Sequence, residues 1–221
     1  MKHIVVDLEM TNVQRKSEAM KICRLETIEI GAVMLDDNLQ EISSFRTYVK
    51  PEYNTGIEKN ITRLTGITDG MVLNAPRFKE ALRMFTDWCN GTGDEVTIYA
   101  WSDSDYTQIA KEMILKEYEV SEDEKPLLEK EWSDFQYEFD SHMGFERQVS
   151  LSMALDMAGI NFSGRKHDAL DDARNTAELL QVFSDKELFN TTLRKIKEFM
   201  EPTETHSTIG DLIDFSVFAV A

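Results

Sequence analysis

Near its start the chain reads Ile4-Val5-Val6-Asp7-Leu8-Glu9-Met10-Thr11, a short apolar run that ends in two acids flanking one leucine. If this run is a strand, its side chains alternate with period two, so Asp7 and Glu9 point to the same face. Two carboxylates held there repel each other and are costly to place near a core. A divalent cation such as Mg²⁺ removes that cost, because it binds carboxylate oxygens. The alternative at this point is that the two acids end the strand in solvent.

The composition predicts one large domain, or one domain with an extension. The chain has 221 residues, of which 42% are hydrophobic, so it can bury a substantial core. We place the domain at residues 1–200 and a C-terminal extension at residues 201–221, where the sequence turns from polar to apolar. No apolar run approaches the roughly 18 residues of a membrane span, and the N-terminus carries no signal-peptide pattern. We therefore expect a cytoplasmic protein without a membrane partner, with Cys23 and Cys89 as reduced thiols.

The net charge of −17 restricts the kinds of partner that the chain can bind. Proteins that bind nucleic acid over a broad surface are usually basic, because neutralising phosphates dominates their affinity. An acidic chain argues against a surface of that kind. It remains compatible with a narrow site in which bound metal ions meet the phosphate.

Apolar periodicity predicts three consecutive strands, followed by helices that alternate with strands. The first strand is the opening stretch, and the next two form a hairpin across residues 26–49. We interpret Glu29 as an edge or hydrogen-bonded glutamate, with a buried acid near the site as the alternative. Further strands are expected at residues 95–101 and from residue 132, and helices at about residues 58–64, 76–89, 106–118, 151–158, 168–183 and 186–200. The acidic residues 121–131 are expected to be solvated. This order is typical of an α/β fold around a mixed sheet.

A second source of acids follows the strand that ends at Trp101. Asp105 falls in the first turn of the next helix, and in open α/β sheets sites form beyond strand ends. The alternative is that Ser102 and Asp105 form a capping box, in which the acid only supports the start of the helix. Asp103 is a weaker rival, as either a metal ligand or a cap.

The third source is the segment from Gly164 to Ala173. Asp168 is well placed as the N-cap of the helix that follows, and Asp171 suits the positive end of that helix. His167 directly precedes the helix, and Asp172 lies near the end of its first turn. An unperturbed histidine has a pKa of about 6.5, which suits proton transfer at neutral pH, although a lone histidine is more often a surface residue.

Together these segments resemble the three signatures of the DEDD exonucleases of the ribonuclease H-like fold, in the subgroup where a histidine precedes the last aspartate. The matching motifs are Asp7-Leu8-Glu9-Met10-Thr11, Trp101-Ser102-Asp103-Ser104-Asp105 and His167-Asp168-Ala169-Leu170-Asp171-Asp172-Ala173. The resemblance covers about residues 2–183. Two lesser segments, Leu64–Thr68 and Trp132–Gln136, resemble the branch that contains the histone-mRNA and small-interfering-RNA 3′ exonucleases and related bacterial proteins. Ser102 departs from the glycine that the family commonly has there.

The resemblance implies a ribonuclease H-like fold with a mixed five-stranded sheet, whose first three strands are antiparallel, flanked by helices. It implies two Mg²⁺ or Mn²⁺ ions held by metal ligands Asp7, Glu9, Asp105 and Asp172, with these acids and His167 as the catalytic residues and His167 as general base. Leu8, Met10 and Thr11 would seat the terminal nucleotide. The expected reaction is 3′→5′ release of nucleoside 5′-monophosphates from the 3′ ends of single-stranded RNA or short oligonucleotides.

Several alternatives stay open. Within enzymes, the substrate could be single-stranded DNA, the role could be polymerase proofreading, or the protein could hydrolyse small phosphoesters. Outside enzymes, the chain could be a nuclease-like protein-interaction domain. In either case we expect the apolar segment 201–221 to pack on the domain or to form a homodimer.

Overall fold

The structure is a computed structural model that describes residues 1–15, 17–54 and 56–200. Its strands are β1 (Lys2–Asn12), β2 (Leu25–Leu35), β3 (Glu41–Tyr48), β4 (Val96–Ala100) and β5 (Ser133–Asp134). They form one sheet in the order β3-β2-β1-β4-β5. The pairs β1–β2 and β2–β3 are antiparallel, whereas β1–β4 and β4–β5 are parallel. The predicted mixed five-stranded sheet, with three antiparallel strands first, is therefore confirmed.

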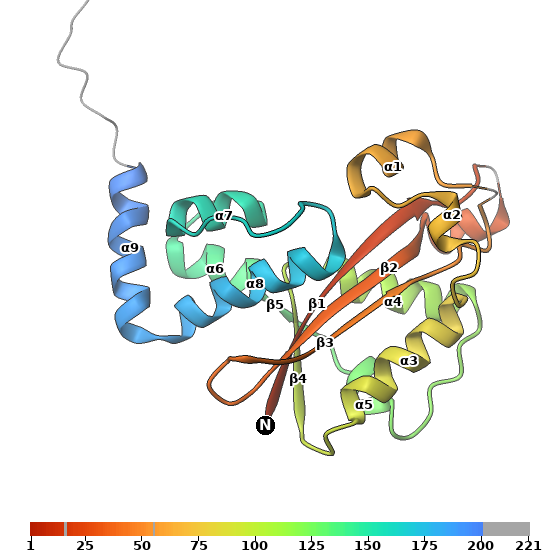
Figure 1. The fold of residues 1–221 in the computed structure, drawn as a ribbon, viewed down its shortest axis with the longest axis horizontal. Coiled ribbons are helices and arrows are strands. Elements are labelled where there is room, and N and C mark those ends of the chain that lie inside the picture. The colour runs from red at the N-terminus through yellow and green to blue at the C-terminus, as the bar shows by residue number, and fades with distance from the viewer. Residues whose placement is uncertain (16, 55, 201–221) are drawn as a thin grey trace, which may run out of the picture.

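Helices cover both faces of this sheet (Figure 1). They are η1 (Glu18–Lys21), α1 (Lys59–Thr65), α2 (Asp69–Val72), α3 (Phe78–Asn90), α4 (Ser104–Leu115), α5 (Lys125–Leu128), α6 (Phe135–Met143), α7 (Leu151–Ala158), α8 (Ala169–Ser184) and α9 (Lys186–Met200). Ile4, Val6 and Ile30 pack with α3, α4 and α5 on one face. Val5 and Val33 pack with α6, α7 and α8 on the other. Within the described residues, no helix has the length and apolar character that crossing a bilayer requires.

The alternation along β1 puts Asp7 and Glu9 on the face that α8 covers, because Val5 lies there. The alternative in which the two acids end the strand in solvent is wrong, since β1 continues to Asn12. What ends at this point is the neighbouring strand: β4 pairs with β1 only as far as Val6 and Ala100. The acids therefore lie beyond the carboxyl end of β4, which is where sites form in open α/β sheets.

The stretch 121–131 is mostly exposed, as its acidic residues predict, but three of its residues are buried. Leu127 and Leu128 are fully buried and belong to the core beside α3 and α4. Glu124 is also buried, where its carboxylate accepts hydrogen bonds from the hydroxyls of Thr86 and Tyr118. Residue type alone misleads here because a buried acid is tolerated once its oxygens are hydrogen-bonded. The tail 201–221 lies outside the described residues, so its packing stays a prediction.

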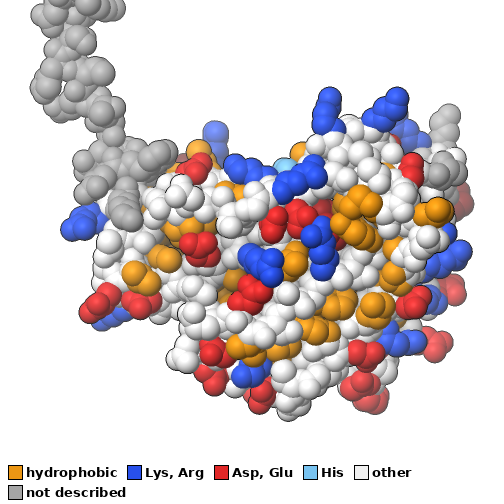
Figure 2. Space-filling model, in the orientation of Figure 1, with side chains coloured by type: hydrophobic (Ala, Val, Ile, Leu, Met, Phe, Trp, Pro, Cys, Tyr) orange, Lys and Arg blue, Asp and Glu red, His pale blue; other side chains and the backbone are white. Residues whose placement is uncertain are grey.

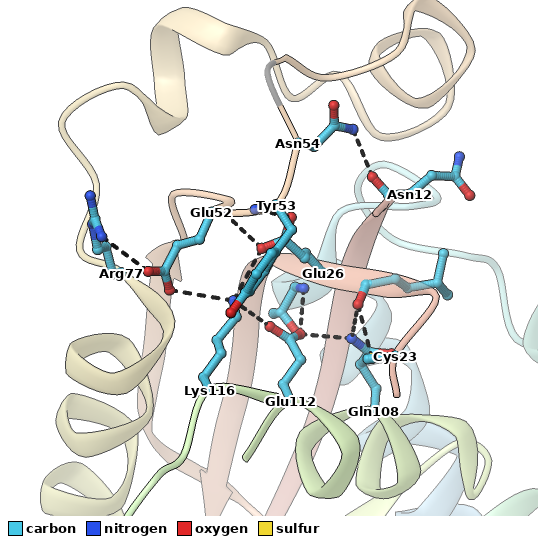
Figure 3. A network of polar contacts seen from close by, with 12 residues as sticks. Asn12, Cys23, Glu26, Glu52, Tyr53, Asn54, Arg77, Gln108, Glu112 and Lys116 are labelled. Atoms are coloured by element: carbon cyan, nitrogen blue, oxygen red, sulfur yellow. Dashed lines mark hydrogen bonds and ion pairs between the residues drawn. The ribbon is translucent and has the colours of Figure 1, made fainter. Parts of the chain in front are cut away.

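A buried ionic cluster fixes the start of β2 against α4 and the loop after β3 (Figure 3). The Lys116 ammonium lies 2.8 Å from Glu112 and 3.2 Å from Glu26, and all three side chains are at most 3% exposed. Glu26 also accepts the backbone N–H groups of Glu52 and Tyr53. Burial alone would lower the pKa of Lys116, but the acids outweigh it and raise that pKa, so the ammonium stays charged.

Lys116→Met tests how much this cluster contributes. The substitution leaves the carboxylates of Glu26 and Glu112 buried without a cation, so we expect the free energy of unfolding to fall by about 3–5 kcal/mol. Urea unfolding followed by circular dichroism measures the change. The matched control is Lys125→Met, because Lys125 pairs with Glu122 at the surface, where an ion pair contributes less than about 1 kcal/mol. Equal loss in the two variants would contradict the assignment.

Candidate active site

The predicted site segments meet at one cleft of about 670 Å³. β1, the turn before α4 and the start of α8 each contribute to it, together with α6 and the segment before α7. The residues that line the cleft are Asp7, Leu8, Glu9, Met10, Trp101, Ser102, Asp103, Ser104, Asp105, Gln136, Gln148, Ser150, Leu151, Ser152, Lys166, His167 and Asp172. All four acids expected to hold metal and the histidine therefore face one space. Figure 2 shows acidic side chains gathered among Lys and Arg side chains around the start of α8.

Asp105 joins α4 to β1. The capping box expected between Ser102 and Asp105 does not form, because the N-cap residue of α4 is Asp103, whose side chain makes no cap hydrogen bond. Asp105 instead accepts the backbone N–H of Leu8 at 3.1 Å and is 5% exposed. This contact brings its carboxylate beside the β1 acids, although the two segments lie far apart in the sequence.

The start of α8 supplies the last acid and the histidine. Asp168 caps the helix, as predicted, by accepting the backbone N–H of Asp171 at 3.2 Å. Asp171 is structural, since it accepts the backbone N–H of Arg165 at 2.8 Å. Asp172 accepts the backbone N–H of His167 at 3.0 Å. His167 has a φ of 61°, a left-handed conformation that is uncommon outside glycine and is found where surrounding contacts impose it.

Each acid of the cleft makes it less favourable for the neighbouring acids to be ionised. The pKa of Asp7 is raised well above its ordinary value. Burial is the main cause, and the negative charges of Asp105, Asp172 and Glu9 add to it. Burial is also the main cause that raises the pKa of Glu9 to about 8, of Asp105 to about 7 and of Asp172 to about 6. Without a compensating cation, Glu9 is mostly protonated and Asp105 about half protonated at pH 7. A bound cation would reverse that preference.

The donor set fits a divalent metal ion. The carboxylates offer hard oxygen ligands of the kind that Mg²⁺ and Mn²⁺ prefer. Ligand atoms of Glu9, His167 and Asp172 all lie within 4.8 Å of one another. A cation between these acids would relieve the repulsion that raises their pKa values, so the electrostatics and the donor chemistry agree.

His167 is suited to accept a proton. Its side chain lines the cleft, and partial burial, together with Arg165 and Lys166, lowers its pKa below the ordinary value. The imidazole is therefore neutral at pH 7, with a nitrogen lone pair available as a base.

Of the three residues expected to bind the terminal nucleotide, two line the cleft and one does not. Leu8 and Met10 line the cleft. Thr11 does not: it is fully buried, and its hydroxyl has no hydrogen-bond partner among the described residues. Their contacts with a nucleotide stay predictions.

The cleft also has a polar wall whose residues are not among the predicted catalytic, metal-binding or nucleotide-binding residues, although Gln136 ends one of the two lesser segments of the family resemblance. Gln136 on α6 lines it and donates to the carbonyl of Val149 at 2.6 Å, which ties α6 to the segment before α7. Gln148 and Ser152 line the same wall. Neutral amides and hydroxyls carry no distinctive spacing, so only the packing of α6 and α7 reveals them. Glu29 is not an edge residue: it is fully buried, ion-paired with Arg46 and hydrogen-bonded to the N–H of Ala169, as the alternative of a buried acid near the site predicts.

Comparison with known proteins agrees with this geometry. Residues 4–180 match the family model RNase_T, described as exonuclease. Human 3′-5′ exoribonuclease 1 is 29% identical over 163 residues, which cover 70% of this chain and 45% of the relative. The PolC-type DNA polymerase III of Clostridium perfringens is 30% identical over 204 residues, which cover 90% of this chain and 12% of the relative. The chain thus spans less than half the length of either relative.

A solved structure shares the fold. The nuclease domain of 3′hExo, described as a DEDDh family member bound to rAMP, superposes with a TM-score of 0.71 at 24% identity. The match covers 82% of this chain and 90% of that domain. The arrangement of sheet and helices is therefore that of the ribonuclease H-like exonucleases, as the sequence motifs predict.

The raised pKa values predict how stability depends on pH. An acid whose pKa is higher in the folded than in the unfolded state binds protons more tightly when folded. Metal-free protein therefore loses stability as pH rises from about 4, the ordinary value of an unfolded carboxyl group, and the loss levels off above about 8. We expect the Tm in EDTA to fall between pH 5.5 and pH 8.5, and Mn²⁺ to raise it more at pH 8 than at pH 5.5. Differential scanning calorimetry measures both.

Asp7→Asn is the matched control, because it removes one of the interacting charges with little change of shape. Its Tm should fall less steeply with pH and respond less to Mn²⁺. Identical pH slopes and identical Mn²⁺ responses in the parent and Asp7→Asn proteins would show that the cleft acids are not the cause.

Proposed function

Because the chain belongs to the exonuclease family whose model covers residues 4–180, we propose that it is a metal-dependent 3′→5′ exonuclease releasing nucleoside 5′-monophosphates. The substrate we favour is single-stranded RNA or a short oligonucleotide. The observation that supports this most is the convergence of four acids and one histidine, from three distant segments, on a single cleft.

In this proposal, Asp7, Glu9, Asp105 and Asp172 hold two Mg²⁺ or Mn²⁺ ions. When bound, such ions make water more acidic and stabilise the attacking and leaving oxygens of an in-line displacement. The chain's own contribution is to hold the ligands in place. Leu8 serves this through its N–H group, which fixes the Asp105 carboxylate beside β1.

His167 is proposed to take the proton from the attacking water. The neutral imidazole can accept it, and the backbone hydrogen bond to Asp172 keeps the base beside a metal ligand. Leu8 and Met10 offer apolar surface in the cleft for the terminal base, while the polar wall of Gln136 and Gln148 offers hydrogen bonds to sugar or phosphate.

The relatives support RNA as the substrate and keep DNA as the alternative. The human relative is named an exoribonuclease, and the 3′hExo domain was solved with rAMP. The Clostridium perfringens relative is a DNA polymerase, which favours a proofreading role on DNA as the second candidate. The acidity of the chain suits a short strand entering a narrow cleft better than a long duplex held on a basic surface.

We also propose that residues 1–200 act as the exonuclease domain, that the protein is cytoplasmic, and that the apolar segment 201–221 mediates a homodimer. The apolar character of the segment supports the last point. Light scattering on the full chain and on a chain that ends at residue 200 tests it, because a dimer that survives the truncation would remove the segment as the interface.

Asp7→Ala should abolish the activity. A metal site contributes several kcal/mol to the transition state, so we expect the rate to fall at least about 100-fold. With Mn²⁺ present, 5′-labelled RNA and DNA strands of one sequence should shorten from the 3′ end, RNA faster. Asp37→Ala, an exposed acid in the β2–β3 turn, is the control and should keep parental activity. An Asp7→Ala protein as active as the parent would refute the proposal.

His167→Asn separates binding from chemistry. Asparagine tolerates the left-handed backbone conformation found at this position but cannot act as a base near pH 7. We expect single-turnover cleavage to slow by about 10²–10⁴-fold while the Kd for the oligonucleotide stays within about threefold. His3→Asn, at the opposite end of β1, is the control and should leave both quantities unchanged. Unchanged turnover in His167→Asn would exclude the residue as the base.

A further inference from the structure

Arg46 links three elements at the edge of the cleft. It lies on β3, yet its guanidinium reaches the start of α8. Its Nε is 2.7 Å from the Glu29 carboxylate on β2, and its Nη2 is 2.6 Å from the Asp168 carboxylate that caps α8. Glu29 is fully buried and the Asp168 side chain is 15% exposed, whereas the Arg46 side chain is 37% exposed, so the guanidinium reaches both carboxylates from the protein surface.

Glu29 contacts the helix as well. Its second carboxylate oxygen accepts the backbone N–H of Ala169, the first residue of α8, at 3.3 Å. Beside it, Gly31 lets the helix approach the sheet closely, because a Cβ at this position would collide with the backbone of Ala169 and Leu170. The first turn of α8 is therefore pinned to β2 and β3 by Glu29, Arg46 and the close contact at Gly31.

This pinned turn carries the two site residues that come from α8. His167 directly precedes Asp168, and the backbone N–H of Asp172 donates to the carbonyl of Asp168 at 2.9 Å. The Asp172 carboxylate accepts the N–H of His167 at 3.0 Å. A shift of Asp168 would consequently move both His167 and Asp172 relative to the acids on β1.

We propose that Arg46 is a positioning residue for the reaction. By binding both Glu29 and Asp168, it fixes the start of α8. This in turn fixes the positions of His167 and Asp172 in the cleft. The inference rests on the proposed exonuclease function. Arg46 does not line the cleft, so it acts through the start of α8 and not on the substrate.

Arg46 also binds Glu29 at a point close to the acids of the cleft. Glu29 pairs with Glu9 across β1 and β2, on the face that α8 covers, so it is a fifth carboxylate next to the site. Its charge contributes to the raised pKa values of Asp7 and Glu9. The guanidinium binds one carboxylate oxygen of Glu29, and the other accepts the N–H of Ala169, so Glu29 is engaged with the helix and does not line the cleft.

The chain offers a matched control on the same two elements. Arg174 on α8 forms a bidentate pair with Glu41 on β3, with nitrogen–oxygen distances of 3.2 and 3.0 Å. This pair also ties α8 to β3, but it lies farther along the helix, and neither residue lines the cleft. Arg174→Met therefore removes a β3–α8 tie without disturbing the first turn.

The test compares kcat, KM and Tm for Arg46→Met, Arg46→Lys and Arg174→Met, on a single-stranded oligonucleotide with saturating Mn²⁺. We expect Arg46→Met to lower kcat about 10–100-fold, the range typical of residues that orient metal ligands, with KM within about threefold. Arg46→Lys should recover only part of kcat, since an ammonium cannot reproduce the planar fork that binds two carboxylates. Arg174→Met should keep kcat within about twofold. An Arg46→Met protein with the kcat of Arg174→Met would overturn the proposal.

A double variant, Glu29→Gln/Arg46→Met, guards against misfolding caused by an unpaired buried charge. The amide oxygen of the introduced glutamine can still accept the Ala169 N–H, but the tie to Asp168 is absent. A kcat that stays low supports positioning, whereas a return to the parental kcat would overturn it and assign the effect to charge alone. Failure of the exonuclease function itself is distinguishable, because the parent and Asp7→Ala proteins would then digest the oligonucleotide equally.

Discussion

Four carboxylates lie close together on one side of the sheet and repel one another. The rest of the structure must hold them there against that repulsion. Asp7 and Glu9 alternate onto the face that α8 covers, and Asp105 and Asp172 are brought to the same place. Their pKa values are raised because burial and the neighbouring carboxylates make the ionised forms unfavourable. A folded chain retains such an arrangement only if other contacts hold the acids in place and a cation compensates their charge.

Backbone N–H groups supply much of that support. The N–H of Leu8 holds Asp105, and the N–H of His167 holds Asp172, so each acid that arrives from a helix is anchored by a donor fixed in the main chain. These donors neutralise no charge, and both acids line the cleft. The site is thus pre-arranged for a metal ion, because its ligands are ordered by contacts independent of that ion.

Two ionic clusters contain residues of β2, and they join the strand to different neighbouring elements. Near its start, Glu26 pairs with Lys116, which joins the sheet to α4 far from the reacting groups. Farther along the strand, Glu29 pairs with Arg46, which joins the sheet to the helix turn that carries Asp172. The first cluster stabilises the fold alone. The second connects the packing of the sheet with the geometry of the cleft, so we expect stability and activity to depend on different residues of one strand.

The sequence by itself indicated the strand that carries Asp7 and Glu9, the cap at Asp168 and the antiparallel start of the sheet, because these follow from local alternation and capping. The set of acids with His167 came from the resemblance of three motifs to the DEDD exonucleases. Only the tertiary structure decided that Asp105 turns to β1 instead of capping α4, that Glu29 is buried against Arg46, and that Gln136 and Gln148 form a wall of the cleft. Each of these depends on contacts between residues far apart in the chain, which local patterns do not encode.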